Sequence, residues 1–523
     1  MSAAEKPYIL STICWTIERK GGYFHVPKSQ TFGWPGHLPD DAADPFFDRS
    51  HRLYGLAVRG SGEQNPEQTL PTDQIVQLPT EVPGEIQETE LPTETTVPPT
   101  TEPEPVPESV VATATVSSQG DLLMHKPVFD TCRQGDGSYN FESIFRYSRD
   151  LIASFDYALA NLETTFGGDD FTYQGNPAFN CPDPLADSVV EAGYDMLLTA
   201  NNHCGDTMAA GVARTLEHIR GKGLATLGTQ LNGEEPKYAI VDVNGIKIGM
   251  VCYSWAYSYD GAKVSMNGLT PIPADGTINF FRNNNLPAFY SELEQIMADM
   301  KAAGAEVTMM QIHWGLEYQL QENETQNKIA QKLCDIGFDV IVGGHPHVVQ
   351  PMELLESTVD PSHKTVCIYS LGNAVSNQRN GYISQAPSYY TEDGVIFTVT
   401  FEKYSDGSVY VAATDVIPTW VNMHTTDGVK EYNILPLQDS TRDQWRDLFR
   451  LNDNTMGFAQ RSYDRTMGIV GEGLEECRTY LDQAKIDREE YYYNLAFHPE
   501  MFETEATEAV TEAAAEETTL PAA

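Results

Sequence analysis

The stretch that decides the fold reads Val340-Ile341-Val342-Gly343-Gly344-His345-Pro346-His347. A short apolar run ends in two glycines, and two histidines follow with one proline between them. A short apolar run bounded by glycines is consistent with a buried strand. Parallel α/β sheets place their ligand sites at the carboxyl ends of such strands. The stretch therefore predicts a buried strand with a polar site at its end.

Other chemically active side chains also follow short apolar runs. Asp121 stands in Gly-Asp-Leu-Leu, Glu163 ends Ala-Asn-Leu-Glu, and His313 begins His-Trp-Gly. Asn202 and His203 lie in Thr-Ala-Asn-Asn-His. Imidazole, carboxylate and carboxamide groups without thiolate are the ligands of a Zn, Mn, Fe or similar centre. We therefore predict a metal site assembled from these strand ends.

The chain is strongly acidic, and its charge is unevenly distributed. The 523 residues carry a formal net charge of -42. Residues 60–113 hold 11 acidic residues and residues 501–523 hold 6, with no Lys or Arg in either segment. Residues 1–59 sum to +1, which leaves -26 for residues 114–500 by subtraction. Such a surface repels nucleic acid, so we expect no nucleic-acid partner.

Composition divides the chain into five segments. Residues 60–113 contain 10 prolines among Thr, Glu and Gln, which predicts a disordered, extended linker. Residues 1–59 are aromatic and glycine-containing, with an uncertain fold, and residues 501–523 form an acidic tail expected to be disordered. Between linker and tail we expect an α/β domain over 114–425 and a helical extension over 426–500.

Targeting signals are weak in this sequence. No run of about 18 apolar residues is present, so we expect no transmembrane helix. Residues 8–15 are mostly apolar, but the run is short and its flanking charges do not match a signal peptide.

Within the 114–425 domain, apolar runs alternate with segments that favour helix. Asn244-Gly245 separates two β runs and is a strong hairpin signal. The alternation predicts a mixed α/β fold with two sheets packed together and helices outside. Helices are expected near 141–152, 184–193, 206–220, 288–303 and 326–337, and strands at 114–117, 157–160, 196–200, 239–243, 246–253, 307–312, 340–342, 365–369, 394–403 and 408–417.

Six motifs in a fixed order carry a resemblance to a known family. Together they resemble the CapA family, bacterial proteins of poly-γ-glutamate capsule synthesis, which looks like a branch of the calcineurin-like metallophosphoesterase superfamily. The resemblance covers about 114–420 and implies a four-layer α/β/β/α sandwich. The motifs are Gly-Asp-Leu-Leu-Met-His (120–125), Asn-Leu-Glu (161–163), Asn-Asn-His-x-x-Asp (201–206), His-Trp-Gly-x-Glu-Tyr (313–318), Gly-Gly-His-Pro-His-Val-Val-Gln-Pro (343–351) and Tyr-Ser-Leu-Gly-Asn (369–373).

The resemblance also implies a role for each matching residue. Asp121 and His347 would bind one divalent ion, and Glu163 stands where the superfamily has a bridging Asp. A second ion would be bound by Asn202, His313 and His345. His203 would bind no metal and would serve as the catalytic acid beside the substrate. The two ions would be Mn, Zn, Fe or Mg and would act as in two-metal hydrolases.

Four further residues have open roles. The superfamily's first motif is Asp-x-His, but the nearest histidine here is His125, four residues after Asp121, so it ranks below the other ligands. Asp206 is most simply a helix N-cap, with orientation of His203 as the alternative. Glu317 is expected to line the pocket or support His313, and Asn373 to cap a turn or to hydrogen-bond a ligand.

Three other residues also have open roles. Trp314 is as well suited to a pocket wall as to a substrate platform. Cys132 and Cys181 flank the early loops and would be able to pair in an oxidising compartment.

Two classes of function follow from the resemblance. One is an extracytoplasmic metal-dependent hydrolase or transferase that acts on a phosphoester or on an anionic γ-glutamyl polymer. The other is a non-catalytic capsule-assembly or export component that binds polymer or membrane proteins of capsule synthesis through the same fold. The resemblance also implies a cell-surface location.

Overall fold

The computed structural model describes residues 14–15, 106–426 and 428–502. The predictions for the rest of residues 1–59, for most of the linker and for 503–523 lie outside these described residues. Among the helices that are described, none combines the length and the apolar character needed to cross a bilayer.

The first of two eight-stranded sheets, here called sheet I, contains the strand that holds Asp121 and the strands that precede Glu163 and Asn202. Its strands β2 to β5 run parallel, whereas β17 pairs antiparallel with both β2 and β18. In neighbour order it consists of β19 (Val429–Pro436), β18 (Val409–Thr426), β17 (Asp393–Tyr404), β2 (Val110–Leu122), β3 (Tyr157–Asn161), β4 (Met196–Leu198) and β5 (Ala225–Leu227), with β16 (Asn373–Val375) paired to β2.

The second sheet, sheet II, contains the strands that precede the three predicted histidine ligands. Four of its strands, β7, β12, β13 and β15, are parallel neighbours, so their carboxyl ends share one edge. In neighbour order it consists of β1 (Cys14–Trp15), β6 (Tyr238–Val243), β7 (Ile246–Trp255), β12 (Val307–His313), β13 (Val340–Gly344), β15 (Lys364–Leu371) and β14 (Val349–Glu356), with β11 (Phe280–Phe281) paired to β7.

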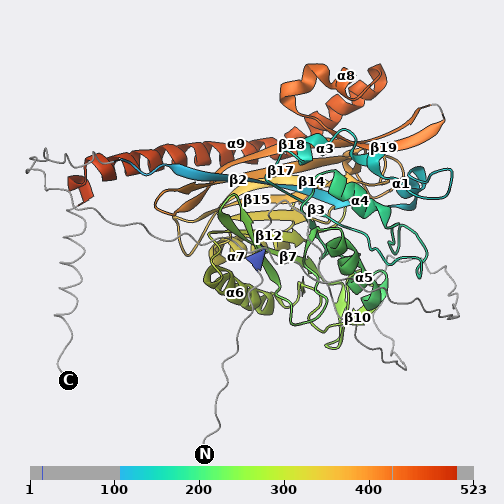
Figure 1. The fold of residues 1–523 in the computed structure, drawn as a ribbon, viewed down its shortest axis with the longest axis horizontal. Helices are drawn as coiled ribbons and strands as arrows, with labels where there is room; N and C mark the ends of the chain where they lie inside the picture. The colour runs from blue at the N-terminus through green and yellow to red at the C-terminus, as the bar shows by residue number, and fades with distance from the viewer. Residues whose placement is uncertain (1–13, 16–105, 427, 503–523) are drawn as a thin grey trace, which may run out of the picture. The chain divides into compact units, whose positions relative to one another are not determined.

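The two sheets pack face to face, with helices on their outer faces. Alternate residues of both sheets, such as Val116 in β2 and Met309 in β12, meet in one buried core. A second core joins the outer face of sheet I to helices between residues 126 and 221. A third core joins sheet II to α6 (Leu286–Ala302) and α7 (Glu324–Ile336), which lie to the left of β7 in Figure 1. This order confirms the expected α/β/β/α layers. The helices are α1 (Lys126–Thr131), α2 (Glu142–Phe145), α3 (Arg149–Ile152), α4 (Pro184–Glu191), α5 (Met208–Gly221), α6 (Leu286–Ala302) and α7 (Glu324–Ile336).

A long carboxyl-terminal helix, α9 (Asp453–Phe497), spans both sheets instead of forming a separate extension (Figure 1). Val470 and Leu474 on α9 belong to the core between the sheets. At Gly473 an added Cβ would lie 1.9 Å from the carbonyl oxygen of Met352 in β14, so only glycine permits this approach. The short helix η1 (Tyr390–Glu392) directly precedes β17, and η2 (Asp439–Gln444) and α8 (Trp445–Leu448) precede α9.

Three expected boundaries are corrected. The range 426–500 is not wholly helical, because β19 extends sheet I beside β18, with Tyr432 and Ile434 buried. The predicted linker, residues 60–113, ends too late. Strand β2 already begins at Val110 and pairs with β17 from that residue onward. The expected helix over 141–152 is broken into α2 and α3. The predicted hairpin at Asn244-Gly245 is confirmed, with φ values of 55° and 85° that suit this turn.

A small sheet covers the Asn-Asn-His turn. Its core residues, such as Val264 and Ile272, pack against Cys204 and Val212, so Cys204 is a packing residue. Cys132 and Cys181 are both free and buried, and the alternative of a disulfide between them is not realised. The strands of this sheet are β8 (Ser258–Tyr259), β9 (Lys263–Ser265) and β10 (Pro271–Pro273).

Candidate metal centre

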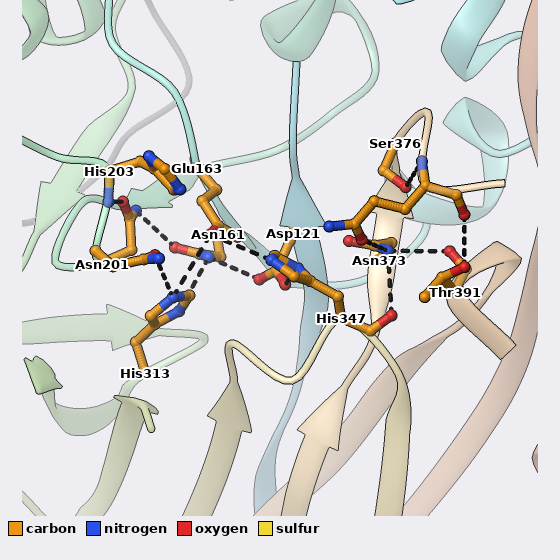
Figure 2. Close-up of polar contacts among 12 residues, drawn as sticks. Asp121, Asn161, Glu163, Asn201, His203, His313, His347, Asn373, Ser376 and Thr391 are labelled. Carbon is orange, nitrogen blue, oxygen red and sulfur yellow. Dashed lines mark hydrogen bonds and ion pairs between the residues drawn. The ribbon is translucent and has the colours of Figure 1, made fainter. Parts of the chain in front are cut away.

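The carboxyl ends of the parallel strands in both sheets converge on one site. In sheet I, Asp121 of β2 pairs with Asn161 of β3. In sheet II, His313 of β12 pairs with Gly344 of β13, immediately before His345. Figure 2 shows side chains from these separate elements pointing toward one another. The predicted convergence of the strand ends is therefore observed.

Two groups of potential metal ligands meet in this site and share one carboxylate. One group consists of Asp121, Glu163 and His347, and the other of Glu163, His313 and His345. Within each group the ligand atoms lie within 4.8 Å of one another, and all five residues are buried. This grouping matches the division between two ions that the resemblance implies. The individual ligand roles remain predictions.

Glu163 is the residue whose environment most requires a cation. Its side chain is fully buried, and neither carboxylate oxygen has a hydrogen-bond partner. Burial, followed by the charge of neighbouring Asp121, raises the pKa of Glu163 well above its usual value. Two carboxylates buried side by side destabilise the folded state unless a proton or a positive ion neutralises their charge. Divalent ions fit this donor set.

Two of the three imidazoles in the ligand groups are held in the neutral state that metal binding requires. Burial lowers the pKa of His313 well below its usual value and that of His345 to about 3, so both are neutral and able to bind metal. His347 differs, because Asp121 accepts a hydrogen bond from its Nδ1 at 3.0 Å. Burial opposes the charged form of His347, but the hydrogen bond and charge of Asp121 outweigh it and raise the pKa.

The backbone at the two histidines of Gly-Gly-His-Pro-His is strained. His345 has a φ of 99° and His347 a φ of 57°, a region that non-glycine residues rarely occupy. Each such residue costs about 1–3 kcal/mol and persists where the surrounding structure enforces it, most often at functional sites. Gly343 is required here, because an added Cβ would lie 2.0 Å from the carbonyl oxygen of Tyr369.

A row of asparagines holds the ligands in place. Asn161 donates to the Oδ1 of Asp121 at 2.7 Å, and its own Oδ1 accepts a hydrogen bond from Asn201. The Oδ1 of predicted ligand Asn202 lies 2.9 Å from the Nε2 of His313. Sequence reasoning gave no role to Asn161 or Asn201, although both lie in the quoted motifs. Their positions in the same motifs as the predicted ligands Glu163 and Asn202 could have indicated a supporting role.

His203 forms a pair with Asp206. The Nδ1 of His203 lies 2.7 Å from the Oδ2 of Asp206, and both residues are buried. Asp206 also accepts hydrogen bonds from the backbone N–H of Phe179 and from the side chain of Asn267. The N-cap expectation for Asp206 is wrong, because Thr207 is the N-cap residue of α5 and the Asp206 carboxylate is used by these other donors.

The residues with open roles lie around the centre. His125 is outside both ligand groups. Its Nδ1 accepts a hydrogen bond from the backbone N–H of Asn377. Burial and the neighbouring His347 lower the pKa of His125 to about 3. Glu317 is exposed and contributes to the raised pKa of Glu163. Asn373 donates to the carbonyl oxygens of His347 and Thr391, so it supports the ligand loop.

Trp314 is a residue of the core between sheet II and its helices. Its ring is buried and stacks on Tyr369, and its Nε1 donates to the carbonyl oxygen of Tyr369. The interpretation as a substrate platform is therefore excluded. Asn267 has no feature in the sequence that marks it as a site residue. It donates a hydrogen bond to Asp206 from the segment between β9 and β10, 61 positions along the chain.

Comparison with known proteins gives a consistent result. A protein-family model described as "Bacterial capsule synthesis protein PGA_cap" matches residues 115–378. The chain is 25% identical over 336 residues to the PGA biosynthesis protein CapA of Bacillus subtilis (strain 168), covering 62% of this chain and 77% of that protein. It is also 25% identical over 269 residues to the capsule biosynthesis protein CapA of Bacillus anthracis, covering 50% of this chain and 60% of that protein.

Among solved structures, the NAD nucleotidase NadN of Haemophilus influenzae matches with a TM-score of 0.36 and 12% sequence identity. The match covers 68% of this chain and 60% of that chain. A likeness of this size carries no weight for the function of this protein.

Proposed function

Because this chain belongs to the bacterial capsule synthesis protein family PGA_cap, we propose that it serves capsule synthesis as a metal-dependent hydrolase with two divalent ions. The observation that carries the proposal is the shared position of Glu163 in both ligand groups, with two buried carboxylate oxygens that accept no hydrogen bond. Asp121 and His347 would complete one ion's ligands, and Asn202, His313 and His345 the other's. Mn, Zn, Fe and Mg all accept such ligands to different degrees.

Bound there, the ions would supply Lewis-acid polarisation of the substrate and a lowered pKa of water. The remaining work falls to residues of this chain. Asp206 engages the Nδ1 of His203, which leaves the Nε2 as the nitrogen that exchanges a proton with the substrate. Asn161 keeps Asp121 oriented, and the strained turn fixes His345 and His347.

The proposed substrate is a phosphoester, because two-metal sites commonly stabilise the attacking and leaving oxygens of a phosphoryl group. The γ-glutamyl bond of the capsule polymer is a second candidate, favoured by the name of the Bacillus subtilis relative. We also propose that the protein acts outside the cytoplasm. Its proposed partners there are membrane proteins of capsule synthesis or export. The formal net charge of -42 over the full chain disfavours nucleic acid as a partner.

The test is metal analysis of the full chain together with turnover of a model phosphodiester and of poly-γ-glutamate. We expect about two ions per chain and hydrolysis of one substrate. Glu163→Gln should lose metal and activity, because a neutral amide cannot bridge two cations as a carboxylate does. The matched control is Glu356→Gln, the same change at an exposed carboxylate that pairs with Lys364.

Two results would overturn this proposal. If the wild-type protein takes up no metal, the proposed metal centre is wrong. Metal-loaded protein that turns over neither substrate, but still supports capsule formation in cells, would instead establish the non-catalytic assembly role.

A further inference from the structure

Trp255 lies at the edge of the candidate metal centre. It is the last residue of β7 and follows Ser254, which pairs with His313 in the parallel register. Its indole ring lies against the imidazole of His345, with ring centroids 5.6 Å apart and the planes at 62°. Neither the motifs of the chain nor the ligand groups include Trp255.

The indole N–H of Trp255 is buried and has no hydrogen-bond partner. The other tryptophans whose side chains the structure describes all donate this hydrogen: Trp314 to Tyr369, Trp420 to Glu392 and Trp445 to Gln438. A buried indole N–H normally finds a partner, because leaving it unpaired carries a desolvation cost. Trp255 is therefore the exception among them, and it is the one beside the metal centre.

The chemistry of the missing partner is restricted. An indole N–H only donates, so its partner must be an acceptor. The carboxylates of Asp121 and Glu163 are acceptors in the same site, but neither receives this hydrogen bond. An oxygen of a molecule bound beside His345 would satisfy it.

The surroundings of Trp255 on its solvent side are also aromatic. Tyr257, with 47% of its surface exposed, lies with its ring centroid 6.2 Å from that of Trp255. Gly268 packs on the Tyr257 ring, where an added Cβ would lie 2.8 Å from a ring carbon. An aromatic surface thus continues outward from His345.

We propose that Trp255 is a substrate-binding residue whose Nε1–H donates a hydrogen bond to an anionic oxygen of the substrate, a phosphoryl or carboxylate oxygen, held at the metal centre. This inference rests on the proposed function, because it needs a ligand at the same centre. A neutral donor stabilises the bound oxygen without competing with the ions for the carboxylates.

Indole NMR tests the contact directly. The full chain, with its 6 tryptophans labelled with ¹⁵N and its centre loaded with zinc, is titrated with phenylphosphonate, and Trp255→Phe assigns the Trp255 signal. We expect the Trp255 Nε1–H signal to shift in a saturable way, only in zinc-loaded protein. The Trp445 signal should stay in place, because its N–H already donates to Gln438.

Calorimetry of the same ligand gives the second measurement. Trp255→Phe keeps an aromatic ring and removes the donor, so phenylphosphonate should bind about ten- to a hundredfold more weakly, the scale of one hydrogen bond to a charged group. Zinc content and melting temperature should not change. Trp445→Phe makes the same replacement far from the centre and should leave the affinity unaltered.

The outcomes separate this inference from the proposed function. If phenylphosphonate binds the zinc-loaded protein but the Trp255 signal does not move, or Trp255→Phe binds with wild-type affinity, Trp255 is only a wall residue and the inference is wrong. If the zinc-loaded wild type binds no phenylphosphonate and turns over no phosphoester or polymer, the proposed function fails and the inference falls with it.

Discussion

The Nδ1 of His347 lies 3.0 Å from the Oδ2 of Asp121, although 226 positions separate the two residues in the chain. Asp121 belongs to β2 of sheet I, and His347 follows β13 of sheet II. The contact therefore exists only when the two sheets are packed together. A metal held by this pair would stabilise the sandwich as a whole, because ligands from both sheets would bind it.

Removing the imidazole of His203 should slow catalysis without removing metal. We expect His203→Ala to lower hydrolysis by about 10²- to 10⁴-fold, the usual contribution of a general acid or base. Metal content, measured by atomic emission, should equal that of the wild type. His498→Ala, which removes a half-exposed imidazole at the end of α9, is the control. Loss of metal from His203→Ala would identify His203 as a ligand instead.

Removing the imidazole of His345 should have the opposite pattern. His345→Gly is the suitable variant, because glycine accepts the φ of 99° at this position and the fold is retained. We expect the bound metal to fall from two ions per chain toward one, with activity lost in parallel. Full metal occupancy in the folded variant would contradict the assignment of His345 to the second ligand group.

Metal binding should strengthen as the pH rises. The pKa of Glu163 is raised by burial and by Asp121, and that of His347 is raised by Asp121, so both retain protons that an incoming ion must displace. Proton displacement favours binding at higher pH. We expect Mn²⁺ to raise the melting temperature more at pH 8 than at pH 5.5, with net proton release in calorimetry. An equal stabilisation at the two pH values would show that these groups lose no proton.

The contact of α9 with sheet II can be tested with two glycines of the same helix. Gly473→Ala should destabilise the protein by about 1–3 kcal/mol, because its Cβ would collide with the backbone of Met352. Gly468→Ala, where an added Cβ meets nothing, should instead stabilise it by about 0.5–1 kcal/mol through helix propensity. Urea unfolding measures both. Similar shifts in the two variants would mean that α9 does not depend on this close approach.

Local patterns in the sequence determined much of this protein. Short apolar runs and their periods identified most strands, and the Asn244-Gly245 turn identified a hairpin. The strand and hairpin predictions are confirmed, because burial and backbone conformation depend on a few neighbouring residues that the sequence shows directly. The residue types at the strand ends, carboxylate, carboxamide and imidazole, predict a metal site, and that site remains a prediction.

Tertiary structure alone decided which candidate ligands lie together and which neighbours support them. The position of Glu163 between two groups depends on the packing of sheet I on sheet II. Asp206 has the local pattern of an N-cap, yet its carboxylate contacts His203 and also accepts hydrogen bonds from Asn267 and Phe179 in other segments. The strand β19 and the unpaired N–H of Trp255 were likewise invisible in the sequence. Contacts between residues far apart in the chain are set by how the layers pack, and a single sequence does not record that packing.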